Sequence, residues 1–573
     1  MKTTAEEVCD SSAMAENSEE RESSPVSYRG ARIQHEQPWK RSFIYLQCYF
    51  LTVATILGTG ILGLPVTIAR SGPIPFLVSF LIGFFMQALL IYLFVDLLQR
   101  CRVAQLESVK PLEPERILMQ NVSPLESPVS DNEDIEEMED IEDADTGLLQ
   151  KDKTVIKLQE ELHPNLHSLG VLFLSKRSNQ AFSFILFFHF VAIGISYVLA
   201  GSEAYAALFH TSHIYIIPAF TWTLSLGILL AQVIIQPIMS LLTLLKGILL
   251  IITVVVTFVV GSEVHQETKN DFTQIGKPFL MGTVALGGIV NIMPFLFSEI
   301  YHNKTQVLWF RRSVLGGLAT CTILNILWCW AVVEIVPQMA VEPVLEERLL
   351  NTSLVRMETT RPAHTFIYSN ISLEESEKAG EIATIPLTKI INQRYTHFSW
   401  VAELIQIFIT ISITVSFLVM GSAMKHTIDG WVNRQWETNA DAVLRIQRWT
   451  LPQIFHTVKM RSVSGGFLSS LVFGIIFVVS MCDPKGFVIM LDKVVSFSLN
   501  TEVGLFIFLM LRTSRSERFK YMTIPLPVGE SLFRLHWLLP VYFLFAVAYD
   551  LCLSMLDISK DMYHSVQSNR SLV

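Results

Sequence analysis

The sequence predicts an all-α, polytopic membrane protein with about eleven transmembrane helices. Of its 573 residues, 51% are apolar and only 17% are charged, whereas soluble globular domains carry about 25% charged residues. The charges gather in a few segments, and the stretches between them are long and apolar. Each such stretch is a candidate span, because a membrane helix needs about 20 mainly apolar residues to satisfy its backbone polar groups internally.

Eleven stretches meet this requirement. They lie near residues 44–68, 74–98, 181–206, 214–234, 238–260, 279–298, 313–336, 400–424, 465–482, 487–511 and 533–556. The joints at 69–73 and at Gln236-Pro237 are very short, and their glycine and proline residues end one helix before the next begins. The first forty residues lack the apolar core of a cleaved signal peptide, so the first stretch is expected to be a span of the mature chain.

The remaining segments define the domain organisation. The run from Glu126 to Asp145 has eleven acidic residues and no Lys or Arg, and such a block repels itself and stays disordered. We therefore expect, in order, a disordered cytosolic N-terminus (1–42), spans one and two (43–98), an acidic cytosolic insertion (99–180), spans three to seven (181–336), an outer loop (337–397), spans eight to eleven (398–556) and an outside C-terminal tail (557–573).

Charge and sequons predict the orientation. Short loops that carry Arg311-Arg312, or Arg512 with Lys520, are expected in the cytosol because basic residues favour that side. The long outer loop contains N-glycosylation sequons at Asn351 and Asn370, which require a lumenal or extracellular location. The two signals agree on a cytosolic N-terminus, and eleven spans then place the C-terminus outside.

A glycine- and proline-rich motif lies midway along span one. Its sequence, GTGILGLP, runs from Gly58 to Pro65, and this composition disfavours a continuous helix. A break inside a bilayer is tolerated only where it faces protein or a cavity. It would free N–H groups for a carboxylate and carbonyl groups for an ammonium group, as an amino-acid zwitterion requires. The alternative is that the glycines only allow close helix packing.

Span six carries a matching interruption. Gly287-Gly288 is followed by Pro294 in the middle of this span. If spans 1–5 and 6–10 are two repeats, five spans per repeat make them inverted, and spans one and six correspond. Interruptions at matching places in inverted halves indicate the binding site of a secondary transporter.

These segments resemble a known family. The motif at 58–65 followed by Gly72 is similar to the first-helix signature of the amino acid/auxin permease family, within the amino acid–polyamine–organocation superfamily. That family includes proton-coupled and sodium-coupled neutral amino acid transporters. Pro294 followed by Ser298-Glu299 resembles its sixth helix. The likeness in arrangement covers about 43–556, with sharp motifs only in spans one and six, and the long insertion departs from the pattern.

The resemblance implies a leucine-transporter-like fold. It is a 5+5 inverted repeat with discontinuous helices 1 and 6 plus an eleventh helix, and it works by alternating access. Span eight adds hydroxyl residues, of which helical spacing allows only Ser412 with Ser416, or Thr410 with Thr414, to point inward together; helix–helix hydrogen bonds are the alternative role. The substrate-binding candidates are Gly58, Thr59, Gly60, Ile61, Gly287, Gly288, Asn291, Ser412 and Ser416.

The ion-coupling candidates are Thr55, Lys246, Thr414 and Glu502. The sodium-coupled branch often has an asparagine four residues before the first motif glycine, where this chain has Ala54. This difference favours the proton-coupled branch or uncoupled transport.

Ionisable residues inside spans are functional hypotheses by default. Glu502, the deepest, is predicted to exchange protons or to serve as a structural partner. Lys246 is expected to extend toward the cytosol; the alternative is a fixed cation that replaces sodium beside span one, as in some sodium-independent relatives. His189 is expected to be a packed polar residue, and Glu203 and Lys493 are further candidates.

A short pattern in the insertion predicts targeting. Asp145, Leu148 and Leu149 form a D-x-x-L-L sequence of the kind that endosomal sorting adaptors read, so these adaptors are expected partners, with an endosomal or lysosomal location or the plasma membrane as alternatives. Cys101 is a candidate for palmitoylation. The seven cysteines form no C-x-x-C pair, and no basic, aromatic-interleaved stripe exists, so neither a metal or other cofactor nor a nucleic acid is expected.

Two functions remain open. The first is secondary transport of small neutral amino acids across the lipid bilayer, either proton-coupled or uncoupled. The second is a transporter-like amino acid sensor or scaffold that signals through the acidic segment. An enzyme is not expected, because no span carries an H-E-x-x-H motif or a nucleophile elbow.

Overall fold

The computed structural model describes residues 38–109, 164–230, 232–264, 268–300, 302–339, 371–444, 451–482 and 490–571. Within these residues the chain is helical and has no strand. Eleven helical stretches are long and apolar enough to cross a membrane, so the predicted all-α polytopic fold is confirmed. The inverted relation between the two halves stays a prediction.

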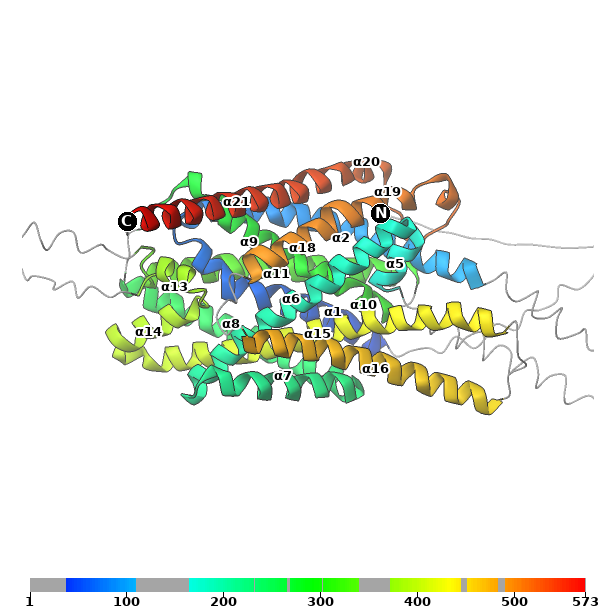
Figure 1. Ribbon diagram of the computed structural model, residues 1–573, viewed down its shortest axis with the longest axis horizontal. Coiled ribbons are helices and arrows are strands. Elements are labelled where there is room, and N and C mark those ends of the chain that lie inside the picture. Colours follow the sequence, from blue (N-terminus) through cyan, green and yellow to red (C-terminus); the bar gives the residue numbers. More distant parts are fainter. Residues whose placement is uncertain are drawn as a thin grey trace, which may run out of the picture. The chain divides into compact units, whose positions relative to one another are not determined.

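The spans follow the predicted order and run along one common direction (Figure 1). They are α1 (Pro38–Thr67), α2 (Pro73–Val109), α6 (Lys176–Phe209), α7 (His213–Leu230), α8 (Gln232–Val264), α9 (Gly276–Gly287) with α10 (Met293–Ser298), α11 (Lys304–Ile335), α15 (Ser399–Leu444), α16 (Leu451–Cys482), α18 (Ser496–Thr501) with α19 (Phe508–Ser514), and α21 (Leu538–Ser571). Two short helices, α13 (Leu373–Ala379) and α14 (Thr384–Arg394), lie at one end of the bundle, and α5 (Leu166–Phe173) lies at the other.

Unequal burial of the spans identifies the core. In the most apolar part of each span, 94% of residues are buried in α1 and 94% in the span formed by α9 and α10. The corresponding shares are 28% for α7, 33% for α16 and 22% for α21. These three helices therefore present much of their apolar surface to lipid, while α1, α9 and α10 are enclosed by protein.

The first span does not break at its glycine-rich motif. α1 is one continuous α-helix with Pro65 inside it, so the predicted discontinuity in span one is wrong. Proline has no N–H and leaves the carbonyl of Ile61, four residues earlier, without its helical donor. The indole Nε1–H of Trp328 on α11 donates to this oxygen over 2.9 Å. A neighbouring side chain thus satisfies the group that proline frees, and the helix continues.

The sixth span is interrupted, as predicted. α9 ends at Gly287, a 3₁₀ turn covers Gly288–Asn291, and α10 begins at Met293. Pro294 lies in the first turn of α10, where proline is tolerated because the early N–H groups have no helical partner. The 3₁₀ turn changes the hydrogen-bond pattern, and such mid-helix turns often mark functional hinges.

The tenth span has irregularities that the sequence did not predict. Two π-helical turns, Met490–Val495 and Glu502–Ile507, flank α18. A π-helical turn widens the helix by one residue, is rare, and occurs frequently at functional sites. The second turn begins at Glu502, the deepest of the acidic candidates.

Several loop boundaries differ from the predicted ones. α2 continues to Val109, and α5 and the start of α6 occupy residues 166–180, so the insertion is shorter than 99–180. The outer loop contributes α13 and α14, and α21 continues through most of the predicted tail to Ser571. Apolar periodicity does not reveal such extensions, because these helix ends are polar.

Loops predicted to lie outside meet at one end of the bundle. Arg70, between α1 and α2, forms an ion pair with Glu374 of α13 at 2.9 Å. Gly72 has φ 83°, and a Cβ there would lie 2.2 Å from the carbonyl oxygen of Lys269. Only glycine fits both the backbone angle and this close approach.

A buried charge cluster lies where α2 meets the segment before α21. Asp96 is 0% exposed and accepts from Arg100 Nε at 2.8 Å and from the backbone N–H of Val528 at 3.0 Å. Arg515 Nη2 lies 3.5 Å from the same carboxylate. The cluster joins α2 to the segment before α21, on the side predicted to be cytosolic.

A single hydrogen bond makes a second link on this side. Arg102 Nη1 on α2 donates to the carbonyl oxygen of Ile300, just after α10, over 2.7 Å. The end of the interrupted sixth span is therefore connected to α2 by one side chain in this contact.

Candidate functional site

The ammonium group of Lys246 lies in the interior of the bundle. The side chain is 0% exposed, and Nζ donates to Ala54 O at 2.9 Å, Ser416 Oγ at 3.1 Å and Ser412 O at 3.4 Å. The prediction that Lys246 extends toward the cytosol is therefore wrong. Its cation lies between α1 and α15, surrounded by oxygen atoms, as the fixed-cation alternative requires.

Gly58 brings the motif of α1 against this cation site. A Cβ at Gly58 would lie 2.2 Å from Ser416 Oγ and 3.0 Å from the hydroxyl oxygen of Tyr197. Ser416 Oγ is also within hydrogen-bonding distance of Ala54 O (3.2 Å) and Ser412 O (2.9 Å). The missing side chain thus lets polar groups of α6 and α15 reach the backbone of α1.

The two hydroxyl pairs of span eight contact different parts of the bundle. Ser412 and Ser416 are 0% exposed and belong to the surroundings of Lys246. Thr414 Oγ1 donates to Thr410 O at 2.7 Å and lies 3.0 Å from the hydroxyl oxygen of Tyr205 on α6. Of the two pairs that the spacing left open, the serines point toward α1, and Thr414 is not among the groups that contact the cation.

Gly60 places the motif against a buried amide of α11. A Cβ at Gly60 would lie 2.6 Å from Asn325 Oδ1. Asn325 is 0% exposed, and neither polar atom of its side chain has a hydrogen-bond partner among the described residues. The neighbouring Ile61 O accepts from Trp328. An unpartnered amide beside the motif is free to bind a polar group.

Span six meets α1 and span ten at its two glycines. A Cβ at Gly288 would lie 3.6 Å from Thr55 Cγ2, and one at Gly287 would lie 2.6 Å from Leu499 Cδ2. Thr55 Oγ1 donates to Leu51 O at 2.8 Å, so its hydroxyl hydrogen is used within α1. Gly288 therefore faces α1, and Gly287 faces α18.

Glu502 faces the interruption of span six. Glu502 and Asn291 are 0% and 2% exposed, and the amide of Asn291 is the polar group beside the carboxyl. Neither side chain has a hydrogen-bond partner among the described residues. An ionised carboxylate in such a place is costly unless it is paired, so Glu502 is placed where a rearrangement of its surroundings would act on its charge.

The other ionisable candidates lie apart from the cation. His189 is 0% exposed, with Nδ1 3.0 Å from Ser498 Oγ. Glu203 lines a separate pocket with Thr384, at the start of α14, and its Oε2 is buried without a partner among the described residues. Lys493 is exposed.

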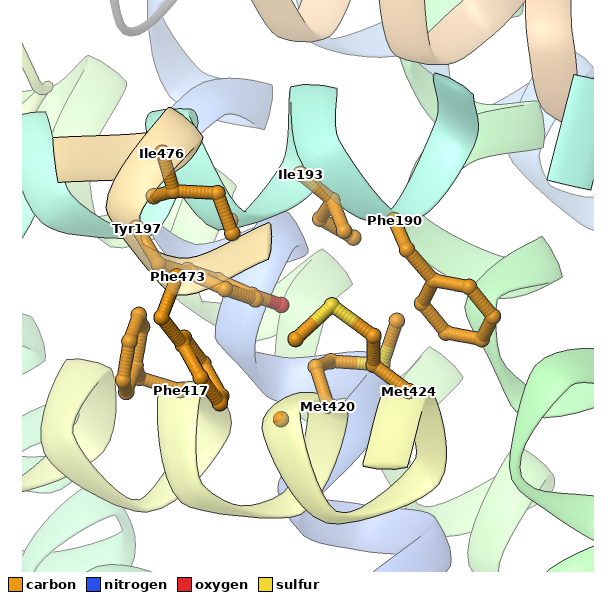
Figure 2. A pocket seen from close by; sticks show the side chains of 10 residues that line it. Phe190, Ile193, Tyr197, Phe417, Met420, Met424, Phe473 and Ile476 are labelled. Atoms are coloured by element: carbon orange, nitrogen blue, oxygen red, sulfur yellow. The ribbon is translucent and has the colours of Figure 1, made fainter. Parts of the chain in front are cut away.

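Tyr197 and Asn325 are site residues that the sequence analysis missed. The hydroxyl of Tyr197 is buried and points into a pocket between α6, α15 and α16 (Figure 2). Each residue lies in a mainly apolar stretch of its span, Tyr197 within GISYVLAG and Asn325 within TILNILW. A search for tyrosine and asparagine side chains at mid-span would have found both.

The predicted modification and targeting residues are largely outside the described part of the chain. Cys101 is the exception, and it is 0% exposed with its sulfur 3.8 Å from Ser168 Oγ. Its predicted palmitoylation therefore has no accessible thiol. The candidates outside the described residues are the side chain of Thr59, the sequons at Asn351 and Asn370, and the sorting residues Asp145, Leu148 and Leu149.

Comparison with known proteins gives only a distant likeness. No family model and no curated protein matches the chain. Among solved structures it is similar to a mutant manganese transporter of Eremococcus coleocola, with a TM-score of 0.46, 12% identity, and coverage of 91% of this chain and 87% of that one. The same transporter in complex with an aromatic bis-isothiourea substituted compound gives a TM-score of 0.46 and 12% identity, with coverage of 90% of this chain and 86% of that one. At these scores the likeness does not identify a substrate.

Proposed function

We propose that this chain is a secondary transporter of neutral amino acids that needs no sodium ion at the position of Lys246. The observation that carries the proposal is the buried ammonium group, which contacts oxygen atoms of Ala54, Ser412 and Ser416. An ammonium group held by oxygens of α1 and α15 is a charge equivalent of a bound monovalent cation. It links α1 to α15 beside the glycine motif, so no ion has to bind to this position and leave it during transport.

The groups around the motif suit a zwitterion. Tyr197, Asn325 and the 3₁₀ turn of span six provide buried polar groups around α1. A neutral amino acid carries one carboxylate and one ammonium group and adds no net charge, whereas a divalent cation would be repelled by the fixed ammonium group of Lys246. These features favour an amino acid over a metal ion as the transported substrate.

Glu502 is the proposed proton carrier. It lies on the π-helical turn of span ten and faces Asn291 in the 3₁₀ turn of span six. A rearrangement of either turn changes the surroundings of this carboxyl, and its proton affinity changes with them. Proton binding and alternating access are thereby coupled in one place. The proposed location is the plasma membrane or an endosomal or lysosomal membrane, with the N-terminus in the cytosol and the C-terminus outside.

Radiolabelled amino acid flux into proteoliposomes tests the proposal. We expect uptake that is insensitive to a sodium gradient and either stimulated by a proton gradient or independent of it. Gly58→Ala should reduce uptake about 10-fold or more, because the new Cβ would lie 2.2 Å from Ser416 Oγ. Gly247→Ala is the matched control, since a Cβ there meets nothing within 4 Å on the helix that carries Lys246.

The outcomes separate the candidate functions. Amino acid binding without flux would instead support a sensor that signals through the acidic segment. Uptake of Mn²⁺ in place of amino acids, or uptake that requires sodium, would refute the proposed substrate or the proposed role of Lys246.

A further inference from the structure

Two adjacent arginines lie where α11 enters the membrane, on the side predicted to be cytosolic. Arg311 and Arg312 belong to the first part of α11, and the apolar stretch of this span begins near residue 313. Within the described part of the chain, neither guanidinium group forms an ion pair with a carboxylate. Two neighbouring like charges repel each other, so an anion that contacts both would be bound favourably.

Aromatic rings hold both guanidinium groups in place. Cζ of Arg311 lies 4.4 Å from the ring centroid of Tyr92 on α2, and Cζ of Arg312 lies 5.4 Å from the ring centroid of Trp309. Trp309 in turn stacks on Tyr45 of α1, with 6.4 Å between the ring centroids. A guanidinium group above a ring is attracted to its face and keeps N–H donors at its edge. Both arginines are therefore oriented in the absence of a ligand.

The helices that carry this cluster pack closely against one another. A Cβ at Gly317 of α11 would lie 2.9 Å from Cβ of Thr52 on α1. The hydroxyl of Tyr49 on α1 also donates to Thr320 Oγ1 on α11 over 3.0 Å, and α2 packs along α11. The rings and guanidinium groups of the three helices are therefore held together at one end of the bundle.

Exposed apolar surface adjoins the two charges. Trp309 is 48% exposed, and Phe43 and Leu46, within two residues of Tyr45 on α1, are each 49% exposed. This surface lies where α1 and α11 enter the bilayer, a level at which tryptophan and tyrosine are enriched. A soluble anion would neutralise the guanidinium groups but leave this surface uncovered. A phospholipid would cover both, since it carries a phosphate and acyl chains in one molecule.

We propose that Arg311 and Arg312 bind the phosphate of an anionic phospholipid in the cytosolic leaflet, with its acyl chains along Trp309 and the exposed side chains of α1. The planar fork of an arginine matches two phosphate oxygens at once. A zwitterionic lipid brings its own cation beside the phosphate and therefore gains less from a pair of guanidinium groups. Because α1, α2 and α11 all contribute side chains, the bound lipid joins the cytosolic ends of three spans. The site is separate from Lys246 and does not depend on the proposed transport function.

Thermal melting of the purified full chain in detergent tests the proposal. The added probes are dioctanoyl phosphatidylserine, dioctanoyl phosphatidylcholine and inorganic phosphate. We expect phosphatidylserine to raise the melting temperature at concentrations at which the other two have no effect. Each basic residue near the headgroups strengthens binding about 5-fold, so Arg311→Gln combined with Arg312→Gln should raise the apparent Kd for phosphatidylserine about 30-fold.

A second basic pair provides the matched control. Lys176 and Arg177 are adjacent and exposed at the start of α6, which is also predicted to be cytosolic. Neither side chain lies over an aromatic ring of the residues that the structure describes. Lys176→Gln combined with Arg177→Gln removes the same charge and should leave the apparent Kd for phosphatidylserine unchanged.

Several results would overturn the proposal. A wild-type protein that phosphatidylserine does not stabilise, or that phosphatidylcholine stabilises equally, has no site for an anionic lipid. Stabilisation by inorganic phosphate alone would indicate a site for a soluble anion. An equal loss of affinity in the two double variants would mean that binding follows net charge only. If the Arg311 and Arg312 double variant does not fold, Arg312→Gln alone is the readout, because this side chain is exposed; we expect about 5-fold weaker binding, and an unchanged Kd would refute the site.

Discussion

Replacing Lys246 by methionine removes the buried charge and keeps most of the side-chain length. In the wild-type protein, Nζ donates to Ala54 O at 2.9 Å, Ser416 Oγ at 3.1 Å and Ser412 O at 3.4 Å. After Lys246→Met, Ser416 Oγ still lies 3.2 Å from Ala54 O and 2.9 Å from Ser412 O. The single hydroxyl hydrogen of Ser416 can therefore still be donated to one of the two backbone acceptors, and the variant is expected to fold.

The stability change combines two opposing effects. Hydrogen bonds to a charged group contribute about 1.5–3 kcal/mol each, so three of them contribute about 5–9 kcal/mol in total. Burying an ammonium group costs several kcal/mol, and Lys246→Met removes that cost as well. We expect the two effects nearly to cancel, with a net change of about 2 kcal/mol or less in the free energy of unfolding.

The effect on transport should be larger than the effect on stability. If movement of α1 relative to α15 depends on one of these charged hydrogen bonds, its loss of about 1.5–3 kcal/mol slows transport by about 10- to 150-fold. Initial uptake rates in proteoliposomes measure this, with Gly247→Ala as the control on the same helix. A Lys246→Met protein that transports at the wild-type rate, with the same response to sodium and proton gradients, would show that the cation has no part in transport.

Three other perturbations test separate features. If a pH gradient stimulates wild-type uptake, Glu502→Gln, which keeps the shape but cannot release a proton, should bring the ratio of uptake with and without the gradient down to one; a ratio that stays at the wild-type value above one would exclude Glu502 as the carrier. Burial, and secondly the charge of Arg102, lowers the pKa of His302 to about 4 from an ordinary value of 6.5. The unfolded chain then binds more protons than the folded chain between pH 6.5 and 4, so stability falls as the pH drops through this window. The melting temperature of His302→Gln should therefore change less with pH in this window; an equal change of melting temperature with pH in both proteins would contradict this. Gly72→Ala must adopt φ 83° with a Cβ 2.2 Å from a carbonyl oxygen, so it should melt at a lower temperature than Gly529→Ala, whose Cβ meets nothing within 4 Å; equal melting temperatures would refute the reasoning.

The spans could be predicted because the bilayer imposes a simple rule on them. A length of about 20 apolar residues is readable from one sequence, and proline and glycine mark the joints, as Gly72-Pro73 does between α1 and α2. The interruption of span six was also predictable, since two glycines and a proline follow one another at mid-span.

The continuity of α1 could not be predicted in the same way. The sequence near Pro65 contains the residues that free a carbonyl, but not the residue that satisfies it, which is Trp328 more than 200 positions later. The position of Lys246 was missed for a related reason. A long side chain that carries a charge was expected to extend toward the cytosol, whereas its direction depends on the oxygens that α1 and α15 provide.

The two polar links that leave α2 on this side differ in the number of their hydrogen bonds. The buried carboxylate of Asp96 accepts from the N–H of Val528, and Arg100 Nη1 donates to Ser514 O over 3.3 Å. Two hydrogen bonds that involve a charged group contribute about 3–6 kcal/mol together. Releasing Arg102 from Ile300 O costs about 1.5–3 kcal/mol, as for other hydrogen bonds made by a charged group. An aqueous path that opens on this side would therefore widen first along the sixth helix. The second helix and the segment before the last helix would move together.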